Sequence, residues 1–224
     1  MDDEIIGSIK KFIEDHNKFL IVSHINPEGD SIGSQLAFTR LLKYLKKDYI
    51  IFNDTKPPKL FNFFDKIGEI KYQSVDVPDD YDACVILDCP VLKRIGKVTE
   101  RVKKAPILNI DHHVSNNNFG SLNWVEPRAS SSGEMVYGLF KEIGVPLDRE
   151  SALYLYVAIL TDTGSFRYEN TSSETHKIAG ELIALGVKPT FVSERLFETK
   201  SLDGILLLGE AISRVWRLRE PPVP

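Results

Sequence analysis

The segment HINPEGD, residues 24–30, carries one imidazole and two carboxylates, at His24, Glu28 and Asp30. Its Asn, Pro and Gly residues are sufficient to build a turn, so the backbone does not need the three ionisable side chains. An imidazole with carboxylates beside it can bind a metal ion or transfer protons. A site of this kind needs further ligands from other parts of the chain.

Further acids and histidines occur at three places along the sequence. Asp88 ends one apolar run, Asp111, His112 and His113 end another, and Asp162 lies in the segment TDTG. Singly, each has an ordinary explanation, as a core or surface histidine or as a carboxylate that caps a turn or a helix. Their combination predicts a shared site if the fold brings them together.

Apolar strands alternate with helices along the chain. The predicted strands are 18–22, DYIIF near residue 50, 81–88 and 105–113. The predicted helices are an N-terminal one with Ile residues at helical spacing, 33–46, 131–144, 149–164, 172–186 and 201–216. This alternation predicts an α/β fold with a mostly parallel sheet flanked by helices on both faces. In such sheets ligands bind at the carboxyl ends of the strands, which is where the acids and histidines fall.

The predicted site gathers several carboxylates with no Lys or Arg interleaved among them. Such carboxylates repel one another and raise each other's pKa, and divalent cations relieve that repulsion. Mixed His and carboxylate ligation suits Mn, Fe, Zn or Mg ions, and an oxygen-rich set favours Mn²⁺ or Mg²⁺. Two metals about 3.5–4 Å apart can clamp the oxygens of an in-line phosphoryl displacement. The residues therefore predict a dinuclear metallohydrolase.

Composition narrows the class of protein. With 224 residues, 42% hydrophobic and 27% charged, the chain is typical of a globular protein. No run approaches the roughly 18 apolar residues of a membrane helix, and the acidic N-terminus is not a signal peptide, so a cytoplasmic protein without membrane partners is expected. Cys84 and Cys89 fit free thiols. The net charge of -4 argues against binding long duplex nucleic acid but leaves short anionic substrates open.

Four segments occur in order along the chain: HINPEGDSIGS, VILDCP, NIDHH and AILTDTGSFRYENT. Together they resemble the signatures of the DHH phosphoesterases, a family named for its Asp-His-His triplet. The resemblance is to the branch of nanoRNases and phosphoadenosine-phosphate (pAp) phosphatases that includes cyclic di-AMP phosphodiesterases, and it runs from about residue 5 to about residue 215. It implies a DHH-type, Rossmann-like fold of three layers.

The resemblance implies two metal positions that share one carboxylate. The ligands would be His24 and Glu28 for the first metal, Asp30, His112 and Asp162 for the second, and Asp88 between the two. The family usually has Asp where this chain has Glu28. Glu keeps the carboxylate but is one methylene longer than Asp. The catalytic efficiency or the preference for one metal over another is therefore the property expected to change.

Other side chains are implied to act on the substrate. His113 would face it and protonate the leaving oxygen, a role that suits a His with a pKa near neutral, and Asp111 would orient the histidines. Arg167 matches a position expected to contact substrate phosphate, with a surface or structural arginine as the alternative. Ser131 and Ser132 lie at a predicted helix N-terminus, whose free N–H groups could bind a substrate anion. The alternative there is an ordinary N-cap.

Residues 1–200 are expected to form a catalytic DHH domain, and residues 201–224 a helix and a Pro-rich linker. That linker would lead to the smaller substrate-binding domain of the family, whose Gly-Gly-Gly-His type motif is absent from this sequence.

The predicted function is hydrolysis of phosphoester bonds with two Mn²⁺ ions, or Mg²⁺ or Co²⁺ in their place. Candidate substrates are di- to pentanucleotides, pAp, and linear or cyclic di-AMP. Two alternatives stay open: an inorganic pyrophosphatase-like hydrolase, and a nucleotide-binding or regulatory module with weakened catalysis. The sequence also leaves open whether the chain pairs with a second copy as a homodimer.

Overall fold

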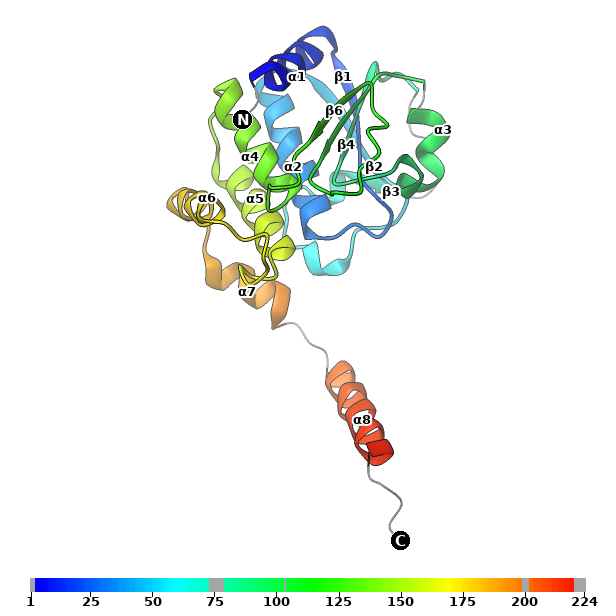
Figure 1. The fold of residues 1–224 in the computed structure, drawn as a ribbon, viewed down its shortest axis with the longest axis vertical. Coiled ribbons are helices and arrows are strands. Elements are labelled where there is room, and N and C mark those ends of the chain that lie inside the picture. Colours follow the sequence, from blue (N-terminus) through cyan, green and yellow to red (C-terminus); the bar gives the residue numbers. More distant parts are fainter. Residues whose placement is uncertain (1–2, 73–78, 103, 199–201, 220–224) are drawn as a thin grey trace. The chain divides into compact units, whose positions relative to one another are not determined.

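The structure is a computed structural model that describes residues 3–72, 79–102, 104–198 and 202–219. The chain divides into two compact units, Met1–Lys188 and Pro189–Pro224 (Figure 1). The first unit holds the sheet and every predicted site residue. The second holds the helices α7 (Pro189–Phe197) and α8 (Leu202–Arg219).

The helix predicted over 201–216 is present as α8. The domain boundary predicted after residue 200 and the Pro-rich end fall in 199–201 and 220–224, outside the described residues. The division into a catalytic domain and a linker therefore stays a prediction. Among the described helices, none has the length and the apolar character that crossing a bilayer requires.

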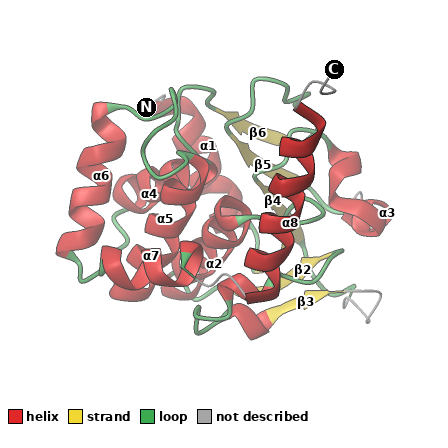
Figure 2. Cartoon of the chain, turned by 90° about the horizontal axis from the view of Figure 1, so that it is seen from below, coloured by secondary structure: helices red, strands yellow, loops and turns green. Residues whose placement is uncertain are grey.

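One six-stranded sheet lies at the centre of the first unit (Figure 2), and all of its strand pairs are parallel. Its order is β3-β2-β1-β4-β5-β6. The strands are β1 (Lys18–Val22), β2 (Asp48–Asn53), β3 (Ile70–Tyr72), β4 (Ala83–Leu87), β5 (Ile107–Asp111) and β6 (Leu122–Val125). The sequence predicts the four inner strands but not β3 and β6. Each of these two edge strands has one buried residue, so neither shows the apolar run that marks a buried strand.

Helices cover both faces of the sheet, as predicted. In Figure 1, α1, α2, α4, α5 and α6 lie on one side of the strands and α3 on the other. The α-helices of the first unit are α1 (Asp3–Asp15), α2 (Gly29–Tyr44), α3 (Thr99–Val102), α4 (Ser132–Ile143), α5 (Arg149–Asp162) and α6 (Ser173–Ala184). Short 3-10 helices are η1 (Lys59–Phe61), η2 (Ile67–Glu69) and η3 (Leu92–Val98). The fold is therefore a three-layer α/β fold.

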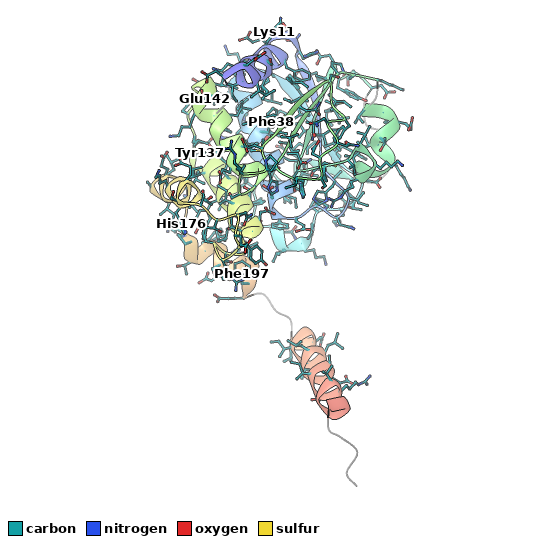
Figure 3. The ribbon with its side chains drawn as sticks, viewed as in Figure 1. Lys11, Phe38, Tyr137, Glu142, His176 and Phe197 are labelled. Atoms are coloured by element: carbon teal, nitrogen blue, oxygen red, sulfur yellow. The ribbon has the colours of Figure 1, made fainter. Side chains whose placement is uncertain are left out.

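Alternation along the inner strands divides the core between the two faces. Leu20 and Ile86 belong to a cluster that η3 and α3 complete with Ile95 and Val102. On the other side the fully buried Phe38 points from α2 into the interior, whereas Lys11 on α1 points outward (Figure 3). Both cysteines are free and buried, and burial raises the pKa of each thiol to about 12.

The strand order places a topological switch between β1 and β4, which are neighbours although their connections run to opposite sides of the sheet. Val22 of β1 pairs with Ile86 of β4, so the residues two places further on, His24 and Asp88, leave the sheet at the same level. Leu87 pairs in turn with Ile110 of β5, which brings Asp111 beside Asp88. The register alone therefore gathers three of the predicted site segments at one edge.

Helices α2 and α5 pack closely because Gly33 has no side chain. A Cβ at position 33 would lie 2.4 Å from the backbone oxygen of Tyr154 and 3.0 Å from the Cβ of Ala158. A backbone oxygen of a buried helix has no room to move aside. The close approach lets α5 carry Asp162, at its end, toward the loop that precedes α2.

We expect Gly33→Ala to lower the free energy of unfolding by about 1–3 kcal/mol, because the added methyl group overlaps α5. Chemical denaturation of the purified chain measures the change. The matched control is Gly180→Ala on the exposed side of α6, where a Cβ meets nothing within 4 Å. That variant is expected to gain about 0.5–1 kcal/mol from helix propensity. Equal effects at the two positions would contradict the packing argument.

Candidate metal centre

A small cavity of about 70 Å³ opens at the carboxyl ends of β1 and β4. Six of the seven side chains that the sequence assigns to a metal or to the substrate's leaving group line it, all but His112. The lining residues are His24, Glu28, Asp30, Asp88, Arg94, His113, Thr161 and Asp162. The predicted site residues thus come to one place from the carboxyl ends of β1, β4 and β5, the start of α2 and the end of α5.

His112 faces three carboxylates with a nitrogen that no described residue satisfies. Its Nδ1 lies 3.3 Å from the backbone oxygen of Ala129, which can only accept, so Nδ1 carries the proton. Its Nε2 is buried without a hydrogen-bond partner among the described residues. That nitrogen lies 3.8 Å from Asp30 Oδ2, 3.8 Å from Asp88 Oδ1 and 3.4 Å from Asp162 Oδ2. A lone pair aimed at three carboxylate oxygens has no favourable partner except a cation.

His24 is oriented in the same way on the other side of Asp88. Its Nδ1–H donates to the backbone oxygen of Ile25 over 2.7 Å, which leaves Nε2 to face Asp88 Oδ2 at 3.4 Å. The hydroxyl of Ser31 lies 2.6 Å from both of these atoms. Fixing the outer nitrogen on a backbone carbonyl is how metal-binding histidines are commonly held.

Asp88 has a backbone conformation that suits its position between the histidines. Its φ of 55° lies in the left-handed region, which Asp and Asn tolerate better than most residues. Its amide still donates to the Ile110 oxygen over 3.0 Å, so the chain leaves β4 abruptly while the pairing with β5 continues. Backbone conformations of this kind collect at functional sites.

Asp30 is held by the N-terminus of α4. Its Oδ2 accepts from the amide of Ser132 and its Oδ1 from the amide of Gly133, both over 2.8 Å. These are the free N–H groups that the sequence analysis offers to a substrate anion, and here the anion is a carboxylate of the chain itself. Ser131 is the N-cap, whose hydroxyl accepts from the amide of Glu134. A substrate role for Ser131 and Ser132 stays a prediction.

Asp162 ends α5 and meets the first loop because Gly29 lets the two segments approach. A Cβ on Gly29 would lie 2.3 Å from the hydroxyl of Thr161, the neighbour of Asp162. The side-chain amide of Asn170 donates to the backbone oxygens of Asp162 and Ser130, over 3.2 Å and 2.8 Å. This amide therefore ties the loop that carries Asp162 to the segment that starts α4.

The two histidines of the DHH triplet make different contacts in the structure. While His112 points at the carboxylates, His113 donates from Nδ1 to Asp111 Oδ1 over 2.7 Å. The second oxygen of the fully buried Asp111 accepts from Asn116 Nδ2 over 2.6 Å, and Asn116 also donates to Asn109. The ring of His113 is fixed at Nδ1, and its Nε2 has no hydrogen bond to the described residues.

Two triplets within this cluster have ligand atoms that all lie within 4.8 Å of one another. They are Asp88, His112 and His113, and Asp30, His112 and Asp162. Both contain imidazole nitrogen and carboxylate oxygen, a donor set that suits divalent transition metals. The residues present therefore fit a divalent cation.

Residues 18–159 match the DHH family, N-terminal domain. The chain belongs to the DHH family. A relative from Thermus thermophilus, named Bifunctional oligoribonuclease and PAP phosphatase NrnA, is 31% identical over 211 residues. Cyclic-di-AMP phosphodiesterase GdpP of Bacillus subtilis is 27% identical over 215 residues. The branch of the family that the sequence resembles is thereby confirmed.

The fold of this DHH chain is also similar to that of solved structures. The crystal structure of an exopolyphosphatase-related protein from Bacteroides fragilis shares 27% identity with a TM-score of 0.89, and the match covers 94% of this chain and 65% of that one. The Thermus relative is matched over 94% of this chain and 62% of its own length, and the Bacillus relative over 87% and 32%. The chain thus spans less than two thirds of each of these proteins.

Burial and mutual repulsion disturb the carboxylates of the DHH site in the absence of a cation. Burial, followed by the charges of Asp88 and Asp162, raises the pKa of Asp30 well above its ordinary value. Burial raises the pKa of Asp162 to about 6. Burial also works against ionisation of Asp88, but its hydrogen bonds with His24 and Ser31 outweigh that cost and lower its pKa. Two of the three carboxylates therefore hold protons more tightly than in water.

Two predicted residues take little part in this arrangement. Glu28 lines the cavity but is exposed, and its carboxylate makes no hydrogen bond or ion pair with a described residue. Arg167 is exposed and donates from Nε to the backbone oxygen of Gly164 over 2.7 Å. It is not among the residues that line the cavity. Metal binding by Glu28 and phosphate binding by Arg167 stay predictions.

Two supporting residues are absent from the sequence analysis. Ser31 follows directly on Asp30 in HINPEGDS, and Asn116 lies three residues after the DHH triplet. The proximity of each to a motif is a signal that could have found it. Ser and Asn are common in turns, however, and only the structure shows that their side chains reach Asp88 and Asp111.

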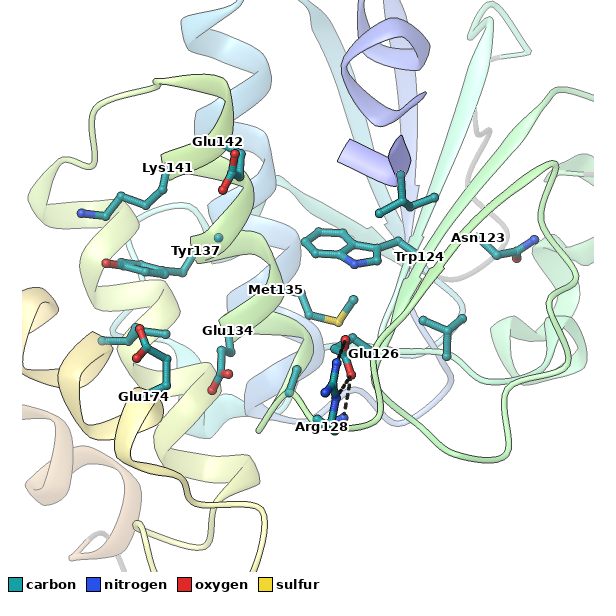
Figure 4. A pocket seen from close by; sticks show the side chains of 15 residues that line it. Asn123, Trp124, Glu126, Arg128, Glu134, Met135, Tyr137, Lys141, Glu142 and Glu174 are labelled. Carbon is teal, nitrogen blue, oxygen red and sulfur yellow. Dashed lines mark hydrogen bonds and ion pairs between the residues drawn. The ribbon is translucent and has the colours of Figure 1, made fainter. Parts of the chain in front are cut away.

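A larger cavity of about 850 Å³ lies elsewhere, between β6 and α4 (Figure 4). Trp124, Met135 and Tyr137 form much of its wall, and Glu126 there is paired with Arg128. Its lining includes none of the predicted metal ligands. The chemistry of the chain is therefore assigned to the small polar cavity and not to the large one.

We expect the affinity for Mn²⁺ to fall by roughly tenfold or more between about pH 7.5 and about pH 5.5, because protons compete with the metal for its ligands. Asp162, with a pKa of about 6, is mostly ionised at the upper pH and mostly protonated at the lower one. Asp30, with its raised pKa, adds a second proton to displace. Isothermal titration at the two pH values measures the change, and an affinity that does not vary would contradict it.

Asp88→Asn is expected to remove the stabilisation of the fold by Mn²⁺. Wild-type protein should gain about 2.7 kcal/mol at a metal concentration 100 times the dissociation constant. Asn keeps the left-handed backbone at position 88 and can keep the contact with Ser31, but lacks the charge. Thermal unfolding with and without Mn²⁺ measures the difference. The control Glu142→Gln, on the wall of the larger cavity, should respond to Mn²⁺ like wild type.

Proposed function

We propose that this chain is the catalytic DHH domain of a divalent-metal-dependent phosphohydrolase that cleaves phosphoester bonds in short oligonucleotides or small nucleotides. The observation that carries the proposal is the buried, unpartnered Nε2 of His112, which faces Asp30, Asp88 and Asp162. An arrangement of this kind is costly unless a cation occupies it.

The proposed ligands are those that the sequence analysis assigns, and Mn²⁺ is the proposed metal, with two ions sharing Asp88. When bound, such ions supply Lewis-acid stabilisation of the phosphoryl oxygens and lower the pKa of a water molecule. The chain's own contribution is to fix the donor atoms before binding. Asp30 is fixed by α4, His24 by Ile25 and His112 by Ala129.

His113 is the proposed general acid. The hydrogen bond that His113 donates to Asp111, opposed by burial and helped by the charge of Asp111, raises the pKa of His113. A protonated ring held at Nδ1 keeps its Nε2–H available for the oxygen that leaves. The ring side chain is 35% exposed and lines the cavity, so a substrate can reach it.

The names of the relatives support the substrate class. One is named as an oligoribonuclease and PAP phosphatase and the other as a cyclic-di-AMP phosphodiesterase. The proposed substrates are therefore di- to pentanucleotides, pAp, and linear or cyclic di-AMP. The cavity is small and is lined by the proposed metal ligands, so the phosphoryl group is the part of the substrate proposed to enter it.

His113→Ala is expected to lower kcat by about 10²- to 10⁴-fold on a substrate of this panel, because proton transfer to the leaving oxygen is lost. Mn²⁺ affinity should stay within about threefold of wild type, since His113 is proposed to lie outside the metal's ligands. Product release from pApA, pAp, cyclic di-AMP and pyrophosphate, with Mn²⁺ and after chelation, measures the activity. The control His16→Gln lies just before β1, at the opposite end of that strand from the site, and should keep full activity.

Three outcomes would contradict parts of this proposal. Turnover that survives chelation would exclude a metal-dependent mechanism. A loss of Mn²⁺ affinity in His113→Ala that matches the loss of kcat would make His113 a ligand and not an acid. Release of phosphate from pyrophosphate, with none of the nucleotides cleaved, would replace the proposed function by that of a pyrophosphatase.

A further inference from the structure

Arg94 lies in the same cavity as the candidate metal ligands. It belongs to η3, the 3-10 helix that follows β4, and its side chain lines the cavity together with His24, Asp88 and His113. Arg94 is partly buried. The sequence analysis expects no Lys or Arg among the carboxylates of the site, and Arg94 corrects that expectation. It is missed because it stands six residues beyond Asp88 and outside the four motifs.

The guanidinium of Arg94 has no partner among the described residues, although carboxylates share its cavity. No described hydrogen bond or ion pair involves its side chain. Arg40, which like Arg94 is partly buried, is paired with Asp148 and Glu150, and Arg128 is paired with Glu126, whereas Arg149, without a partner among the described residues, is exposed to solvent. A partly buried arginine with a purely structural role would be expected to pair as Arg40 does. Five N–H donors beside a metal site are thus left to bind something else.

The backbone fixes Arg94 relative to the first loop of the site. Its carbonyl oxygen accepts from the amide of Ile25, next to His24, over 2.7 Å. Its own amide donates to the oxygen of Val91 over 3.0 Å. Gly96 then turns the chain with a φ of 77°, packed against the side chain of Asp54. The backbone of Arg94, from which the side chain extends, is therefore held beside the metal site by hydrogen bonds of its own carbonyl and amide groups.

Charge balance indicates what the guanidinium binds. With two divalent cations balanced by the carboxylates of Glu28, Asp30, Asp88 and Asp162, the unpaired guanidinium leaves one positive charge without a counter-charge in the cavity. An anion with several oxygens relieves that excess, and guanidinium groups match phosphate oxygens with two parallel hydrogen bonds. Arg94 lines the same cavity as the metal ligands, so the anion that meets both is the reacting phosphoryl group and not a remote part of a nucleotide.

We propose that Arg94 donates hydrogen bonds to the non-bridging oxygens of the phosphoryl group that is cleaved, and that it stabilises the negative charge that grows on them in the transition state. This proposal rests on the proposed function. It assigns to η3 a part in substrate binding that the sequence analysis places on Arg167 and the N-terminus of α4.

The test compares Arg94→Gln, Arg94→Lys and the control Lys93→Gln, which removes one charge from an exposed neighbour in the same helix. Turnover of pApA with Mn²⁺ is measured, together with AMP binding to the Mn²⁺-loaded protein, Mn²⁺ affinity and thermal unfolding. Arg94→Gln should lose about 10²- to 10³-fold in kcat/KM, as removal of a transition-state donor does. Its AMP affinity should fall by about tenfold or more, since a bidentate contact to phosphate is lost.

The other variants separate this role from a general effect of charge or of folding. Arg94→Lys should keep part of the activity, because a point charge replaces a two-pronged donor. Lys93→Gln should stay within about threefold of wild type, as an exposed charge does. The Mn²⁺ affinity and the Tm of Arg94→Gln should not fall below those of wild type, since the variant removes a positive charge from the metal cavity. Loss of activity that is equal in Arg94→Gln and Lys93→Gln, or that follows lost Mn²⁺ affinity or a lower Tm, would overturn the proposal.

Failure of this proposal can be told apart from failure of the proposed function. If wild type cleaves pApA and Arg94→Gln cleaves it equally well, the function stands and the role of Arg94 is wrong. If wild type cleaves nothing but binds AMP in a way that Arg94→Gln abolishes, the role in phosphate binding stands and the proposed function is wrong. If wild type neither cleaves pApA nor binds AMP, both are wrong.

Discussion

The mutual repulsion of Asp30, Asp88 and Asp162 is the constraint on which the rest of this structure depends. Their oxygens lie 3.4–3.8 Å from one imidazole nitrogen, and Asp30 and Asp88 are buried, so water does little to screen the charges of these two. A folded chain tolerates such a group of charges only if it is protonated or neutralised by a cation. The amides of α4 that hold Asp30 and the hydroxyl that bridges His24 and Asp88 keep the cluster in place at that cost.

The fold brings ligands from distant parts of the chain to one place. Parallel strands in register bring His24, Asp88 and Asp111 to one level at the point where the connections of β1 and β4 diverge. Asp162, in contrast, lies at the end of α5 and follows no strand of the sheet. The close packing of α5 against α2 and its preceding loop requires Gly29 and Gly33 to lack side chains. The site is therefore assembled by two devices, a strand register and a close packing of helices.

The sequence predicts the register of the strands far better than the packing of the helices. Apolar runs that end in acids mark the inner strands, and parallel pairing then implies that their ends meet, so the cluster of His24, Asp88 and His112 is predictable. Contacts that depend on the packing of α4 are not. No sequence pattern shows that the N-terminal amides of α4 are filled by Asp30, more than a hundred positions earlier. Edge strands such as β6 are missed for a related reason, because half-exposed residues lack an apolar run.

The distribution of the metal ligands along the chain has a consequence for folding. They run from residue 24 to residue 162, so the centre exists only after β1, β4, β5 and α5 have all docked. Contacts of such long range form late on a folding pathway. A cation bound there would slow unfolding and leave the rate of folding nearly unchanged, since interactions absent from the transition state act on unfolding alone. The metal would thus increase the kinetic stability of the folded chain without being needed for the sheet to form.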